Sequence, residues 1–369
     1  LMVEATHHAD GRRRVVITGF GAKPCLGQSA AETWEGKREG RSGIRPVNME
    51  PMLAFEGKWP SRVAGQIVDL DFSGVLEPRE AKKLDRATIL GVLAADAAVT
   101  HSGIDFDACD RERCGVVIGS GVGGIQTIED GMTTLHTRGG DRISPFTVPR
   151  LMVNATAGNV SIRHGLLGPC SAHATACASS GHAIGDAMGY IQRGLADVVV
   201  TGGAEAAVTP LCVASFSTMK ALTTRNDEPG RASRPFDQGR DGFVLAEGGA
   251  ALVIENLEHA KARGATIYAE LVGYGNSADA HHITAPDAKG EGAMRSMRAA
   301  LRDAKMSPES IDYVNAHGTS TPLGDAAEVA ALLKVFGDHA RKSAGGKLLM
   351  SPTKSVHGHA LGASGAGEM

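Results

Sequence analysis

The chain has 369 residues, 48 glycines, few aromatic residues (4%) and a formal net charge of −3. This charge excludes a globally basic nucleic-acid binder, and no apolar run is long enough to span a membrane. The six cysteines form no CxxC pair and no disulfide framework, so we expect a protein of the reducing cytoplasm. Length and glycine content favour a compact α/β enzyme of two or three structural units.

Strand-like and helix-like segments alternate along the first two thirds of the chain. Residues 130–148 are polar and glycine-rich and are expected to form an irregular excursion. Residues 222–240 read as a loop rich in Arg, Asp and Pro. The expected strands are residues 14–21, 114–120, 197–201 (ended by a glycine pair) and 249–255, and the expected helices are residues 29–39, 77–102 and 149–164.

The pattern restarts near residue 267. The Val-Gly-Tyr-Gly segment at 272–275 mirrors Ile-Thr-Gly-Phe-Gly at 17–21, and residues 311–317 take the place of 115–120. This weak internal duplication predicts two βαβ-rich halves with mixed, mostly parallel sheets. We place the first half, which carries most insertions, at residues 1–264 and the second at residues 265–369.

Cys177 stands in a run of small residues, Thr175 to Gly181, where a helix is expected to begin. A thiol at the positive end of a helix dipole has a lowered pKa and a larger nucleophilic thiolate fraction. A lone cysteine is more often a buried hydrophobe, so this feature alone is weak. Two later histidine segments strengthen it, because each follows an expected strand and active sites of α/β sheets collect at strand ends. These segments are Asn315–Pro322 and Thr353–Gly362.

Several ordered motifs resemble those of the β-ketoacyl-acyl-carrier-protein synthases, most closely the synthase II type. The resemblance covers about 350 residues and implies a thiolase-like α/β fold in α-β-α-β-α layers. The matching motifs are TACASSGHAIG (175–185), GGAEAAVTPL (202–211), LTTRND (222–227), SRPFDQGRDGFVLAEG (233–248), NAHGTSTPLGD (315–325) and TKSVHGHALGASGAGE (353–368).

The resemblance implies roles for five residues in a decarboxylating Claisen condensation of an acyl chain with malonyl-acyl-carrier protein. Cys177 would hold the acyl chain, and His317 and His359 would donate hydrogen bonds to the malonyl thioester carbonyl while CO₂ leaves. Lys354 and Glu368 would support the histidines. An enolate needs preorganised donors, and neutral imidazoles can donate without protonating the carbanion. The resemblance implies no cofactor and no metal ion.

The resemblance also implies contacts with the substrate and with protein partners. Thr319 and Thr321 match hydroxyls that face the pantetheine arm. An apolar strand, Asp197–Thr201, would join two copies across a twofold axis in a homodimer. Basic residues are candidates for docking the acidic carrier protein, against the alternative of an ordinary solvated face. They are Arg79, Lys82, Lys83, Arg142 and Arg225.

The chain departs from the family pattern mainly at its end. It stops at Glu368-Met369, before the Gly-Phe-Gly-Gly-Thr-Asn-like segment that carries a gating phenylalanine and an oxyanion-hole amide. We therefore expect a second half that lacks its C-terminal strands, and an inactive fragment is an open alternative. His357 lies two residues before His359, so the second catalytic histidine needs a structure for its assignment.

Other functions stay open at this point. A polyketide-type or nodulation-type ketosynthase would use the same three residues on another acyl chain. A thiolase would use a second cysteine as base, and an inactive partner subunit would lack Cys177. The segment Gly119–Gly124 fits GxGxxG after a strand, but no acidic strand end follows at the spacing that a dinucleotide site requires. His281 and His282 lack a set of clustered ligands for a metal.

Overall fold

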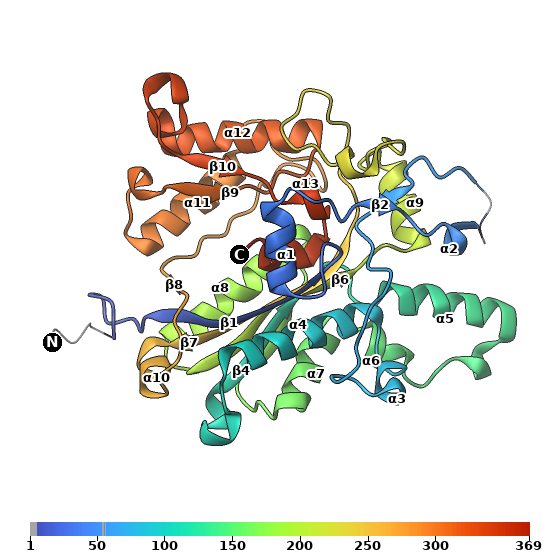
Figure 1. The fold of residues 1–369 in the computed structure, drawn as a ribbon, viewed down its shortest axis with the longest axis horizontal. Helices are drawn as coiled ribbons and strands as arrows, with labels where there is room; N and C mark the ends of the chain where they lie inside the picture. Colours follow the sequence, from blue (N-terminus) through green and yellow to red (C-terminus); the bar gives the residue numbers. More distant parts are fainter. Residues whose placement is uncertain (1–5, 54, 56) are drawn as a thin grey trace.

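The computed structural model describes residues 6–53, 55 and 57–369 (Figure 1). Its centre is a mixed six-stranded sheet in which four strands (β5, β4, β6 and β1) share one direction and β7 and β8 run the opposite way. In spatial order the strands are β5 (Cys170–His173), β4 (Cys114–Gly119), β6 (Val198–Ala206), β7 (Glu247–Asn256), β1 (Val15–Pro24) and β8 (Ala269–Leu271).

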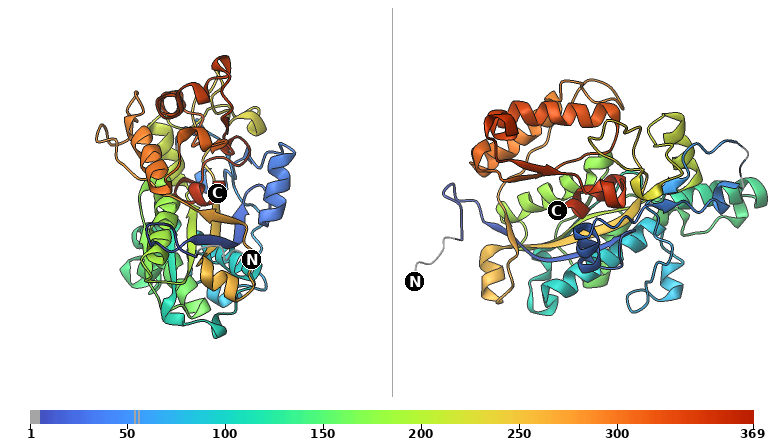
Figure 2. Two further views of the ribbon diagram at one scale, coloured as in Figure 1. Left: turned by 90° about the vertical axis from the view of Figure 1, so that its left-hand side faces the viewer. Right: turned by 45° about the horizontal axis from the view of Figure 1, so that its top comes forward.

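Helices cover both faces of this sheet. Helices α4 (Arg86–Ser102) and α7 (Ala155–His164) pack on one face, and α8 (Ser179–Gln192) and α14 (Ser364–Glu368) pack on the other. Beyond α8 lie a parallel strand pair and two further helices, which complete five layers in the order α-β-α-β-α (Figures 1 and 2). These elements are β9 (Tyr313–Asn315), β10 (Leu349–Ser351), α11 (Glu291–Ala304) and α12 (Pro322–Phe336).

Shorter elements connect these layers and surround the site. None of the helices within the described ranges is long and apolar enough to cross a membrane. The remaining helices and strands are α1 (Ala30–Arg38), β2 (Arg45–Pro46), α2 (Glu50–Leu53), β3 (Val63–Ala64), α3 (Pro78–Ala81), α5 (Ile125–Arg138), α6 (Thr147–Leu151), α9 (Pro210–Thr218), α10 (Leu257–Ala262) and α13 (Lys354–His357).

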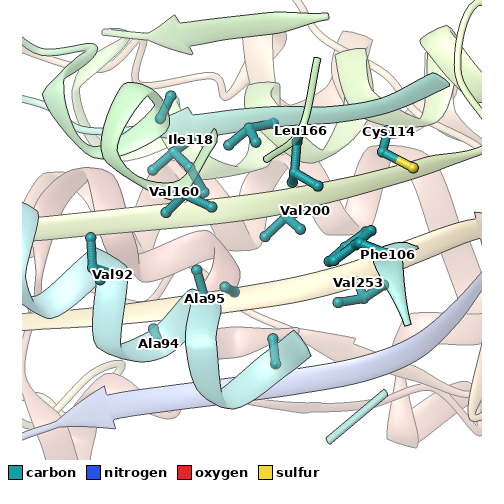
Figure 3. Close-up of a cluster of buried hydrophobic side chains, with 14 of the residues drawn as sticks. Val92, Ala94, Ala95, Phe106, Cys114, Ile118, Val160, Leu166, Val200 and Val253 are labelled. Carbon is teal, nitrogen blue, oxygen red and sulfur yellow. The ribbon is translucent and has the colours of Figure 1, made fainter. Parts of the chain in front are cut away.

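The largest core lies between the sheet and the pair α4 and α7 (Figure 3). Ile118 of β4 and Val200 of β6 point into it, while their neighbours Val117 and Val199 point toward α8 on the other face. This alternation follows from the two-residue period of a strand. Because both faces are covered by helices, β6 is buried along its whole length and carries no exposed residue.

Three predictions about helices are wrong. The helix expected over residues 149–164 is interrupted at residues 152–154, between α6 and α7. The helix expected over 77–102 is divided into α3 and α4, because Asp85 caps α4 by accepting from Ala87 N at 2.9 Å and also binds Thr127 Oγ1 at 2.6 Å. Residues 130–138 were expected to be irregular, but they belong to α5. The apolar side chains of this helix recur at helical spacing along one face.

Two predicted strands also differ from the structure. The strand expected to end at Gly202-Gly203 continues to Ala206, since β4 and β7 pair with it on both sides through the glycines. The dimer contact predicted for Asp197–Thr201 is wrong, because Val198, Val199 and Val200 are fully buried inside the sheet. In the second half, β8 pairs with β1 of the first sheet instead of with β9.

Close packing of α4 on the sheet provides a test of this architecture. A methyl group on Gly249 of β7 would lie 2.5 Å from the Leu90 carbonyl oxygen of α4. Gly249→Ala should therefore lower the free energy of unfolding by about 1–3 kcal/mol. Gly158→Ala in α7 meets no atom within 4 Å and should raise it by up to about 1 kcal/mol. Urea unfolding of both variants measures the difference, and equal stabilities would contradict the packing described.

Candidate active site

The cysteine lies on a strained turn at the start of α8. Ala176 has a left-handed φ of 51°, and residues Ala176–Ala178 form one 3₁₀ turn directly before the helix. Ser179 holds this turn, because its hydroxyl donates to Ala176 O at 2.7 Å and accepts from Thr175 N at 2.9 Å. The turn presents Cys177 beside the histidines at a fixed position.

Two histidines meet at the sulfur. His359 Nε2 lies 2.9 Å from Cys177 Sγ, and the rings of His317 and His359 have centroids 5.2 Å apart in an edge-to-face arrangement. The ligand atoms of these three residues all lie within 4.8 Å of one another, close enough that they could also hold a soft metal ion. His357 points elsewhere and is paired with Thr353 Oγ1 at 3.1 Å.

Lys354 and Glu368 form a buried ion pair behind this cluster. Lys354 is only 1% exposed, and its ammonium contacts Glu368 Oε1 and donates to His317 O at 2.7 Å. Glu328 of α12 accepts from the backbone N–H groups of His317 (2.6 Å) and Gly318 (2.8 Å). The loop that carries His317 is therefore held from both sides by charged groups.

Electrostatics keep the two histidines neutral. Burial, and then the Lys354 ammonium, lower the pKa of His359 well below its ordinary value. Desolvation and then Lys354 lower the pKa of His317 in the same direction, although the residue as a whole is exposed. Each ring therefore carries a single N–H at neutral pH. Ser364 Oγ lies 2.9 Å from His359 Nδ1. When that hydroxyl donates, the proton is left on Nε2, which faces the sulfur.

The predicted lowering of the Cys177 pKa is wrong. Burial raises the pKa of the thiol, and the opposing effects of Lys354 and of a peptide N–H do not reverse this. A helix N-terminus alone is too weak to offset removal of water from a thiolate. The resting cysteine is thus a thiol with His359 in contact, and a transfer of its proton must accompany attack.

Three residues of the site were not predicted from the sequence: Ser179, Ser364 and Glu328. Glu328 had the best available signal, because Asp325 and Glu328 are three residues apart on one helix directly after the HGTST segment. Asp325 accepts from Ser320 N at 3.1 Å. A pair of carboxylates at this spacing faces one side of a helix and can bind the amides of the preceding loop.

The two threonines lie near the histidine loop and also serve structural purposes. Thr319 is buried, and its hydroxyl lies 3.0 Å from that of Thr321. Thr321 caps α12 by accepting from Gly324 N at 3.2 Å. A cavity of about 760 Å³ reaches the site and is lined in part by Cys177, Asn315 and His317. The thiol is accordingly reachable from outside.

All five candidate docking residues are exposed, but the structure does not bring all of them together. Arg79 lies in α3, Lys82 and Lys83 follow directly after it, and Lys83 Nζ lies 5.4 Å from the centre of the Phe146 ring. Arg142 precedes that phenylalanine in the chain. Arg225 belongs to the separate loop at 222–240, where it donates to Gly239 O at 2.6 Å.

Comparison with known proteins shows the family of this chain. The model of the β-ketoacyl synthase N-terminal domain matches residues 12–260, and that of the C-terminal domain matches residues 268–369. The chain therefore belongs to the β-ketoacyl synthase family. Proteins named 3-oxoacyl-[acyl-carrier-protein] synthase 2 from Coxiella burnetii and Vibrio harveyi are 45% and 46% identical to it. The alignments cover 96% and 97% of this chain and 84% of each relative.

Solved structures show the same fold. A β-ketoacyl synthase from Burkholderia phymatum has a TM-score of 0.86 and 37% identity, over 96% of this chain and 84% of that chain. A ketosynthase solved in complex with its type II polyketide acyl-carrier protein has a TM-score of 0.86 and 32% identity, over 97% and 85%. The family and the fold together make this chain an acyltransferase of the condensing class.

The raised pKa of the Cys177 thiol predicts how its reactivity depends on pH. Because the thiolate is disfavoured, the rate of Cys177 alkylation by iodoacetamide should rise with pH and reach its midpoint above the ordinary pKa of a cysteine. Lys354→Met removes the nearest cation and should move this midpoint further up. The exposed Lys347→Met serves as control. Peptide mapping identifies the alkylated residue. A midpoint at or below the ordinary value, or one that is unchanged in Lys354→Met, would contradict the electrostatics described.

Proposed function

We propose that this chain condenses an acyl group held on Cys177 with malonyl-acyl-carrier protein, giving 3-oxoacyl-acyl-carrier protein in fatty-acid elongation. The observation that carries the proposal is the convergence of Cys177 Sγ, His317 and His359 on one small volume, with both imidazoles neutral. The curated relatives at 45–46% identity, named 3-oxoacyl-[acyl-carrier-protein] synthase 2, support this substrate class.

The reaction has two steps at this site. In the first, Cys177 Sγ attacks the carbonyl of an acyl-carrier-protein thioester, the carrier thiol leaves with a proton, and a thioester forms on the enzyme. In the second, His317 and His359 donate to the carbonyl oxygen of the malonyl thioester. The bond to the carboxylate breaks, CO₂ leaves, and the enolate carbon attacks the acyl carbonyl and expels Cys177. Donors aimed at developing negative charge are the chief source of such rate acceleration.

Neutrality of the histidines matters for the second step. A protonated imidazole beside the enolate could deliver its proton to the carbanion and end the reaction without a new carbon–carbon bond. Burial, and then Lys354, lower the pKa of His317 and His359, and the charge of Lys354 is balanced by Glu368. We assign Lys354 and Glu368 to this supporting task, and Thr319 and Thr321 to the pantetheine arm.

Individual replacement of the histidines tests the assignment. His317→Ala and His359→Ala should each lower the rate of malonyl decarboxylation by about 10²–10³. His357→Gln, which alters a buried histidine directed away from the sulfur, should retain most activity. Products from a panel of acyl-carrier proteins and malonyl-carrier protein are read by mass spectrometry. Full loss in His357→Gln with activity in His359→Ala would exchange their roles, and no condensation by the unmodified chain would refute the function.

For the partner, we propose the basic residues Arg79, Lys82 and Lys83 as the docking surface for the acidic carrier protein. A solved relative, 32% identical, is a ketosynthase bound to its acyl-carrier protein, which supports a partner of this kind.

The six cysteines are free, which fits the cytoplasm as the site of the reaction.

We also propose a homodimer, with β5 as the contact in place of the strand predicted from sequence. Strand β5 is the edge of the central sheet. The Pro169 and His173 carbonyls accept from Val116 N and Ser120 N of β4. Strand alternation therefore directs the N–H groups of Cys170 and Ala172 away from β4. A second copy placed about a twofold axis can pair with these groups and cover the edge.

Ala172→Pro tests the dimer contact, because it deletes an outward N–H and leaves the ladder to β4 intact. We expect light scattering of the unmodified chain to give twice the 38.2 kDa chain mass. The proline variant should weaken dimerisation by about tenfold or more, the loss of roughly 1.4 kcal/mol. Ala172→Ser keeps the N–H and should remain dimeric. A monomer at micromolar concentration for the unmodified chain would contradict the proposal.

A further inference from the structure

Glu205 is a fully buried carboxylate at the end of β6, directly below the site. Its Oε1 accepts from Ser120 Oγ at 2.9 Å and from Val122 N at 3.3 Å. Its Oε2 accepts from Gly121 N at 2.6 Å and from Gly362 N at 3.0 Å. The four donors come from two loops that are more than 230 residues apart in the chain.

These four donors fit an ionised carboxylate. A carboxylate accepts at about four lone-pair positions, whereas a protonated carboxyl group would have to donate, and among these four partners only the Ser120 hydroxyl can also accept. Burial raises the pKa of Glu205, and the four hydrogen bonds oppose that rise. Within the part of the chain that the structure describes, Glu205 forms no ion pair, so peptide and hydroxyl dipoles balance its charge.

Two of the three amides bound to Glu205, those of Gly121 and Val122, belong to the GxGxxG segment. In a dinucleotide-binding protein such amides would face a phosphate. Here a side chain of the protein itself occupies them, which removes the phosphate-binding interpretation of Gly119–Gly124. The segment instead supplies donors that link β6 to a second loop.

The second loop carries the apparatus around His359. A Cβ atom on Gly362 would lie 2.3 Å from Gly121 N, so the two loops are in direct contact at Glu205. Leu361, in the same 3₁₀ turn, has a left-handed φ of 40°. This turn leads to Ser364, whose hydroxyl contacts His359 Nδ1. A shift of the turn would release that hydroxyl from the ring.

We propose that Glu205 is a positioning residue of the condensation: its buried carboxylate clamps the turn at 120–122 to the turn at 361–363. The clamp keeps Ser364 on His359 Nδ1, and thereby keeps the Nε2 proton of His359 directed at the reacting carbonyl and at Cys177. Glu205 touches none of the reacting atoms. This inference rests on the function proposed above, and it adds a residue that acts through the turn and through Ser364.

Glu205→Gln tests the clamp with little change of volume. Even with its oxygen kept on Gly121 N and Gly362 N, the glutamine turns its NH2 group toward Val122 N, which is also a donor, so the turn at 120–122 should shift relative to the turn at 361–363. We expect kcat for condensation to fall by about tenfold or more, because small displacements of catalytic groups are costly, while KM changes less than threefold. In ¹⁵N-histidine spectra, assigned with His359→Ala, His359 should change from one neutral tautomer to a mixture.

Two further variants separate positioning from general stability. Glu255→Gln replaces another fully buried carboxylate, on β7, that is paired with Arg263 outside the site. It should lower the melting temperature and leave kcat of the folded protein and the His359 signals unchanged. Ser120→Ala removes one of the four donors and should lower kcat about threefold to tenfold. It also tests the clamp if Glu205→Gln does not fold.

The outcomes are distinguishable from failure of the proposed function. If the unmodified chain does not condense its substrates, the function is refuted, and the ¹⁵N spectra still report on the clamp. The clamp is refuted if Glu205→Gln folds with kcat within twofold and an unchanged His359 tautomer. It is also refuted if Glu255→Gln reproduces both effects, or if Ser120→Ala has unchanged kcat.

Discussion

The contact between Cys177 Sγ and His359 Nε2, 2.9 Å across 182 residues of chain, sets the constraint that the rest of the structure satisfies. A helix start from the first half and a loop from the second must be held together without blocking the thiol. The His359 backbone is tied to the first half by a β-bridge, in which its N–H donates to Val244 O (2.8 Å) and its carbonyl accepts from Ala246 N (2.9 Å). Hydrogen bonds to backbone amides, Glu205 beneath the site and Glu328 beside it, provide the necessary fixation.

Buried charge is the means by which this site is both rigid and reactive. Lys354 is 1% exposed, a position that costs several kcal/mol for an unpaired ammonium. Its pairing with Glu368 and its bond to His317 O offset that cost. Burial, and then the same ammonium, lower the pKa of both histidines, so Lys354 anchors the His317 loop and also favours the neutral imidazoles that condensation needs.

Glycine makes the close approach of these segments possible. Gly119 of β4 lies against the first residues of α8, where a Cβ atom would be 2.4 Å from the Ser179 carbonyl carbon. Gly121 and Gly362 meet in the same way around Glu205. Small residues at these positions allow the nucleophile turn, the sheet end and the His359 loop to share one compact volume, which larger side chains would separate.

The sequence by itself determined the alternation of strands and helices, the family, and the three candidate residues Cys177, His317 and His359 that the structure brings together, because local patterns and ordered motifs encode them. It did not determine that Val198–Val200 lie inside the sheet, because apolar strands at an edge and in the middle look alike in sequence. It gave the wrong direction for the Cys177 pKa, since desolvation depends on neighbours far away in the chain. Only the tertiary structure revealed Glu205 as the group between two distant turns, because hydrogen bonds to backbone amides require no particular side chain at the other end and so leave no mark in the sequence.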